Sequence, residues 1–143
     1  MITLNHIGIA VSQAPKQLAE LQKLFSLLGL TVDHTEPVPE QGVTTHFIPV
    51  PARGGETTSL ELLEITDPLG TVAKFVDKRG PGIHHLSFLV GKGELDPLTL
   101  KLRGAGYRLI YDAARDGAHQ MRVNFIHPAS AGGILVELME PRA

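Results

Sequence analysis

The stretch His6-Ile7-Gly8-Ile9-Ala10-Val11 decides the fold, because it returns later in the chain as His85-Leu86-Ser87-Phe88-Leu89-Val90. Both stretches are short apolar runs of the kind that form β-strands. Two further pairs of segments match in the same order: Phe47-Ile48 with Phe125-Ile126, and Leu60-Glu61-Leu62-Leu63-Glu64 with Val136-Glu137-Leu138-Met139-Glu140. A repeat at nearly constant spacing predicts two copies of one structural unit.

Each half is expected to contain one strand, one helix and three further strands. Apolar and β-branched runs predict strands over Leu4–Val11, Leu30–His34, Val43–Val50, Ser59–Ile65, His84–Val90, Tyr107–Tyr111, Met121–Ile126 and Ile134–Met139. Proline at helix starts and glycine at helix ends predict three helices. The first follows Ser12 and closes at Gly29, and the second runs from Asp67-Pro68 to Gly80 with Leu69, Val72, Phe75 and Val76 facing inward. The third begins at Asp96-Pro97, with Leu98 and Leu102 facing inward. The fold class is therefore α+β, with tandem βαβββ modules.

The length of 143 residues suits a single domain, with modules of about 1–66 and 83–143 joined by a helical connector, 67–82. The 15 glycines and 10 prolines exceed average usage and indicate a β-rich chain with many turns.

Composition excludes several classes of function. Lys and Arg number 13 against 15 Asp and Glu, and this balance argues against nucleic acid or an anionic membrane as partner. The chain has no cysteine, so disulfides and thiolate chemistry are excluded. No signal peptide or long apolar run is evident, and a cytoplasmic location is expected.

Four residues carry the chemistry, because the same residue types recur at matching positions of the repeat: His6 and Glu61, then His85 and Glu137. Side chains alternate between the two faces of a strand, so Glu61 and Glu64 cannot share one wet face. For the same reason, Glu137 and Glu140 lie on opposite faces of their strand. Each strand therefore places one carboxylate on a mainly apolar surface, where it needs a paired charge or a metal.

Two imidazoles and two carboxylates suit one divalent ion of intermediate hardness per chain, namely Co, Ni, Mn, Fe or Zn. An octahedral ion would keep two positions for substrate oxygens. The alternative is that the matched residues are inherited from an ancestral unit and have no function. His34, His46 and His119 are interpreted as surface or packing residues, and His127 as a brace before Pro128.

At this point a family resemblance becomes specific. The segments NHIGIAV, PEQGV, LELLE, VAKFVDKRGPGIHHLSF, GYRLIYDAARDGA and NFIHPASAGGILVELME resemble the methylmalonyl-CoA epimerases of the vicinal oxygen chelate superfamily, which includes glyoxalase I, bleomycin resistance proteins and dioxygenases. The resemblance implies a cupped, incomplete eight-stranded barrel around a divalent metal, an acyl-CoA substrate and a homodimer. Carried over by position, it implies His6, Glu61, His85 and Glu137 as metal ligands.

The chain departs from the family pattern in three places. One branch of the epimerases has a glutamate, assigned as a catalytic base, three residues after the glycine of EQGV, and Thr45 stands there in this chain. Ala129 replaces the basic residue that commonly follows His-Pro, and the Pro51–Thr58 loop is longer than usual.

Epimerisation of a 2-acyl thioester removes the proton between two carbonyl groups and returns it on the opposite face, which requires two acid/base groups. Glu137 is favoured as one base, and Glu61 is the possible second. The runner-up function is a glyoxalase I-like lyase that acts on a glutathione adduct at the same metal site. A ring-cleaving dioxygenase fits less well, since Glu61 would fill a position that such an iron site leaves open. A third possibility, from another class, is a protein that binds a small molecule without catalysis.

Overall fold

The computed structural model describes residues 1–142, which divide into two compact units. The first unit is His6–His84, and the second comprises Met1–Asn5 together with residues 85–142. Within the described residues, no helix is long and apolar enough to cross a membrane.

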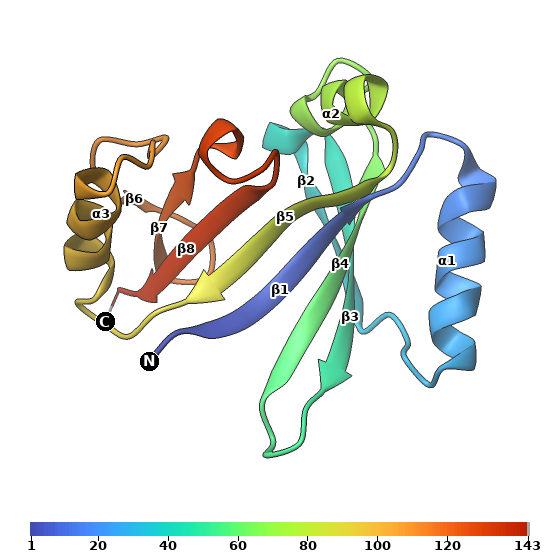
Figure 1. Cartoon of the computed structure of the whole chain (residues 1–143). Helices are drawn as coiled ribbons and strands as arrows, with labels where there is room; N and C mark the ends of the chain where they lie inside the picture. The colour runs from blue at the N-terminus through green and yellow to red at the C-terminus, as the bar shows by residue number, and fades with distance from the viewer. Residues whose placement is uncertain (143) are drawn as a thin grey trace. The chain divides into compact units, whose positions relative to one another are not determined.

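The first unit is built on strands in the order β2-β3-β4-β1 (Figure 1). Its elements are β1 (Thr3–Ala10, which begins in the second unit), α1 (Pro15–Leu27), β2 (His34–Val38), the short 3₁₀ helix η1 (Pro39–Gln41), β3 (Val43–Pro51), β4 (Thr57–Ile65) and α2 (Thr71–Arg79). β1 runs parallel to β4, whereas β2, β3 and β4 are joined by antiparallel pairing.

The second unit has the strand order β5-β8-β7-β6 (Figure 1). This order matches that of the first unit when the first is read from β1 outward, as β1-β4-β3-β2. Its elements are β5 (Gly82–Leu89, which begins in the first unit), α3 (Leu95–Gly104), β6 (Arg115–Asp116), β7 (Met121–Ile126), the 3₁₀ helix η2 (Pro128–Ser130) and β8 (Leu135–Pro141). β5 is parallel to β8, and β7 pairs with β8 in the antiparallel sense. The predicted α+β class and the repeated strand-helix-strand order are confirmed.

Each unit has its own apolar core. In the first unit Ala10, Val43 and Leu63 pack with Val72 of α2. In the second unit α3 contributes Leu95, which packs with Val90, Ile126 and Leu138. Leu98 and Leu102 of α3 pack against this second core, as the helical spacing predicted.

Two strand predictions were wrong. The segment Leu30–Asp33 is not a strand, because the Leu30 amide donates to Phe25 O at 2.8 Å and finishes the turn after α1. The strand begins instead at His34 and includes Pro37, which an edge strand tolerates. The segment Tyr107–Tyr111 has only an isolated bridge from Leu109 to Ile126.

At Tyr111 the Asn124 side chain takes the place of the backbone hydrogen bonds of a strand pair. Asn124 accepts from the Tyr111 amide and donates to the Tyr111 carbonyl, each at 3.1 Å. Those backbone groups therefore pair with an amide side chain instead of a neighbouring strand.

The predicted helix starts were shifted by a few residues. Gly70 is the N-cap of α2, and the Asp67 carboxylate accepts from the Leu69 amide in the preceding turn. Leu69 was expected to point inward, but it is exposed because it precedes the helix. The third helix begins at Leu95, one residue before the predicted Asp96.

Glu140 on β8 shows how the second unit handles a buried charge. It is 2% exposed, and its Oε2 accepts from the amides of Gly93 and Leu95 at the start of α3, at 3.0 and 2.9 Å. Its Oε1 accepts from Arg122, which also contacts Asp96. Glu140 is therefore a structural carboxylate that anchors α3 to β8.

We expect Glu140→Gln to lower the free energy of unfolding by about 2 kcal/mol, because two amides and a guanidinium lose a charged acceptor. The matched control is Glu64→Gln at the equivalent position of the first unit. That glutamate is 40% exposed, so its loss should cost under about 1 kcal/mol. Urea titration compares the two, and equal losses would contradict the anchoring role of Glu140.

Candidate metal and proton-transfer site

In the first unit the structure brings His6 and Glu61 together. His6 Nδ1 lies 3.0 Å from Glu61 Oε2, and the two side chains are only 12% and 13% exposed. The parallel pairing of β1 with β4 sets Gly8 beside Glu61 and places His6 on the same face, two residues earlier. Gly8, which has no side chain, therefore lies next to the His6–Glu61 pair.

The His6–Glu61 pair fits two ligands of one metal ion. An octahedral ion that binds an imidazole nitrogen and a carboxylate oxygen at about 2.1 Å, at right angles to each other, would hold these two atoms about 3.0 Å apart. Among residues 1–142, which the structure describes, no three His, Asp or Glu side chains converge on a single ion position, so the four predicted ligands are brought together only as neighbours within each unit.

In the second unit His85 and Glu137 lie on neighbouring strands and on one face. The β5–β8 register pairs Ser87 with Glu137 and puts His85 two residues before Ser87, as His6 precedes Gly8. Ser87 is fully buried and its Oγ donates to Glu137 Oε1 at 2.6 Å. The serine thus fixes the orientation of the carboxylate, a contact that residue spacing alone did not reveal.

A phenylalanine stands opposite each of these glutamates. Phe47 on β3 pairs with Glu61, and Phe125 on β7 pairs with Glu137. The Phe47-Ile48 and Phe125-Ile126 matches in the sequence therefore mark an apolar wall beside each carboxylate. Sequence reasoning used these segments to find the repeat but gave the aromatic rings no role.

The neighbouring residues outside the predicted set have structural partners. Glu64, on the face opposite Glu61, lies 3.1 Å from His46 Nε2. His84 packs edge-on against Phe75 of α2, with ring centroids 4.9 Å apart. Burial lowers the pKa of His84 below its usual value, which favours the neutral ring. These contacts agree with the packing role that was expected for His46.

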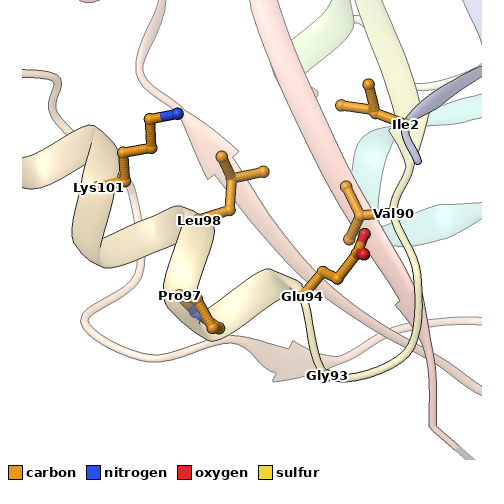
Figure 2. A pocket seen from close by; sticks show the side chains of 7 residues that line it. All are labelled: Ile2, Val90, Gly93, Glu94, Pro97, Leu98 and Lys101. Carbon is orange, nitrogen blue, oxygen red and sulfur yellow. The ribbon is translucent and has the colours of Figure 1, made fainter.

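A pocket of about 420 Å³ lies elsewhere in the second unit, between the N-terminal segment and α3 (Figure 2). Its lining is mainly apolar, with Ile2, Val90 and Leu98 among the wall residues and Lys101 on the helix side. None of the predicted site residues lines it.

The fold and the paired residues define a class that comparison with known proteins confirms. The chain belongs to the glyoxalase/bleomycin resistance protein/dioxygenase superfamily, whose family model matches residues 5–125.

Within that superfamily several of the similar proteins bear epimerase names. The chain is 33% identical to the ethylmalonyl-CoA/methylmalonyl-CoA epimerase of Cereibacter sphaeroides, over 94% of this chain and 95% of the relative. It is 39% identical to the crystal structure of methylmalonyl-CoA epimerase from Mycobacterium tuberculosis, with a TM-score of 0.74 over 96% of this chain and 87% of that one.

A third match carries a ligand. A variant of Streptomyces coelicolor methylmalonyl-CoA epimerase in complex with 2-nitronate-propionyl-CoA is 32% identical, with a TM-score of 0.76 over 98% of this chain and 97% of that one. The resemblance drawn from the sequence motifs is confirmed.

We expect Ser87→Ala to weaken binding of a divalent ion by about 10- to 100-fold, since the Glu137 carboxylate loses the donor that orients it. Calorimetric titration with Co²⁺ measures the effect. Ser130→Ala is the control, because it also removes a serine contact, to the Arg108 amide at 3.1 Å, away from the histidine–glutamate pairs. Equal affinity in both variants would contradict the orienting role of Ser87.

Proposed function

We propose that this chain epimerises methylmalonyl-CoA at C2. The observation that carries the proposal is the close His6–Glu61 pair, repeated in sequence and strand position by His85 and Glu137. Similarity to epimerases over nearly the whole chain supports the same reaction, and the CoA ligand of the Streptomyces coelicolor structure supports an acyl-CoA substrate.

The two pairs are proposed to hold one divalent ion, chosen from Co, Ni, Mn, Fe and Zn. The ligands are His6, Glu61, His85 and Glu137, whose two carboxylates balance the charge of the ion. When bound, the ion supplies positive charge that stabilises the negative oxygen of an enolate. The apolar rings of Phe47 and Phe125 beside the two glutamates help to exclude water from this region.

Proton transfer is the work of the chain's own carboxylates. The C2 proton of the substrate lies between two carbonyl groups and is acidic for a C–H bond. Glu137 is the favoured base, and the Ser87 hydroxyl donates to its Oε1 and so orients the carboxylate. Glu61 is the possible second group, although it would first have to separate from His6.

The direct test is proton NMR of methylmalonyl-CoA in heavy water with the metal-loaded protein. We expect the C2 proton signal to disappear far faster than in the blank, because each removal and return exchanges it with solvent. Exchange at the blank rate together with turnover of a glutathione hemithioacetal would favour the glyoxalase I-like lyase instead. Exchange at the blank rate with no turnover of either substrate would favour a binding protein.

Glu137→Gln is expected to slow C2 proton exchange by about 100-fold or more, since an amide cannot accept the proton. The variant should still bind the ion, because the amide oxygen keeps a donor in place. Metal analysis of the purified variant and the same NMR assay measure the two properties. Unimpaired exchange would remove Glu137 from the role of base.

A further inference from the structure

A row of aromatic rings leads from Glu137 to an arginine at the edge of the second unit. Phe125 stands opposite Glu137 on the neighbouring strand, and its ring meets the Tyr111 ring edge-on, with centroids 5.8 Å apart. The Arg115 guanidinium lies over the Tyr111 ring, 4.0 Å from its centroid. The strand register agrees, because Arg115 pairs with Val123, two residues before Phe125, and so lies on the face that carries Glu137.

The charge of Arg115 is available to a ligand. The residue is exposed, and none of the ion pairs among residues 1–142 involves its guanidinium. The adjacent carboxylate of Asp116 is paired with Arg142, whose Nε lies 3.6 Å from Asp116 Oδ1. A guanidinium stacked on an aromatic ring is held in one plane, with its N–H donors directed outward from the edge. Arg115 is therefore an oriented cation that no carboxylate of the described chain neutralises.

A second arginine lies on the same face of this unit. Leu109 pairs with Ile126 and packs with it in the second core. Arg108, one residue earlier, therefore faces the other side of the segment, which is the side of Phe125. Its carbonyl accepts from the His127 amide at 2.8 Å, so its backbone is held against β7, and the residue is exposed. Two exposed guanidinium groups thus border this face of the second unit.

The corresponding edge of the first unit carries the opposite charge. There the His34 ring stacks on Phe47, with centroids 4.2 Å apart and planes at 7°. Asp33 Oδ2 lies 2.8 Å from His34 Nδ1, and Glu36 Oε1 lies 3.4 Å from His34 Nε2. Carboxylates repel an anionic ligand, whereas guanidinium groups attract one. The edge of the second unit is therefore the one suited to the anionic end of a substrate.

The distance between Arg115 and Glu137 suits a substrate handle. Arg115 pairs with Val123, and Val123 pairs with Met139, two residues after Glu137. Adjacent strands are about 4.8 Å apart and alternate residues about 6.8 Å, so the Cα atoms of Arg115 and Glu137 are on the order of 12 Å apart. The pantetheine arm of CoA, which contains two amide links, extends on the order of 15 Å from its thioester to its phosphates. A phosphate at the end of that arm can therefore reach Arg115 when the thioester lies near Glu137.

We infer that Arg115 binds a phosphate of the CoA moiety, in the positive potential that it shares with Arg108. This inference rests on the proposed function and names the part of the substrate that the second unit recognises. The guanidinium fork matches phosphate oxygens and donates charge-assisted hydrogen bonds to them. Stacking on Tyr111 holds the fork in place, which reduces the side-chain entropy lost on binding. Glutathione carries no phosphate, so this contact selects a CoA thioester over a glutathione adduct.

The test compares two unreactive thioesters by calorimetric titration of the metal-loaded protein. Propionyl-CoA carries the phosphates, whereas propionyl-pantetheine has the same thioester and arm without them. We expect Arg115→Gln to weaken propionyl-CoA binding by about 10-fold, because a charged donor to phosphate is lost, and to leave the Kd of propionyl-pantetheine unchanged. Arg115→Lys should recover part of the affinity, since it keeps the positive charge.

The control is Lys101→Gln, which removes an exposed cation from α3 and should bind both thioesters like the wild type. An unchanged Kd of propionyl-CoA in Arg115→Gln, or an equal loss for the two thioesters, would overturn the inference. Equal affinity of the wild-type protein for propionyl-CoA and propionyl-pantetheine would also overturn it.

Exchange of the C2 proton of methylmalonyl-CoA judges the proposed reaction separately. Binding of propionyl-CoA that depends on Arg115, without C2 exchange in the wild-type protein, would refute epimerisation and retain the phosphate contact. C2 exchange together with propionyl-CoA binding that is independent of Arg115 would overturn the inference alone.

Discussion

An ionised carboxylate on a mainly apolar strand face needs a partner, and this constraint organises both units. Glu64 and Glu140 have theirs in His46 and in Arg122 with the α3 amides. Glu61 and Glu137, on the opposite faces of the same strands, lie beside His6 and Ser87. One glutamate of each strand therefore has a structural partner, and the other is the one that we propose for the chemistry.

Strand pairing gives the two units matching arrangements of these side chains. In both units a central strand that carries a histidine runs parallel to a strand that carries a glutamate, and an antiparallel neighbour adds a phenylalanine. Gly8 and Ser87 stand directly opposite Glu61 and Glu137 on the neighbouring strands. Because both residues are small, each glutamate lies close to the strand that carries the histidine. The duplication thus yields two similar histidine–glutamate arrangements, and in the second one the Ser87 hydroxyl orients the carboxylate.

Much of this could be predicted from sequence, since the repeat and the strand alternation identify both glutamates and separate them from Glu64 and Glu140. The misses have physical causes. The strand before η1 was expected over Leu30–His34, but the Leu30 amide closes the turn after α1 and the strand begins at His34. Likewise, hydrogen bonds from Asn124 replace a ladder at Tyr111, and no local pattern signals such a long-range contact.

The central proposal is that His6, Glu61, His85 and Glu137 are the ligands of one divalent ion. Its most direct test is the stoichiometry and affinity of Co²⁺ binding by the wild-type chain and by two variants, His6→Ala and His85→Ala. The account predicts one ion per wild-type chain and a large loss of affinity in both variants. Two ions per chain, or an unchanged affinity in either variant, would contradict it.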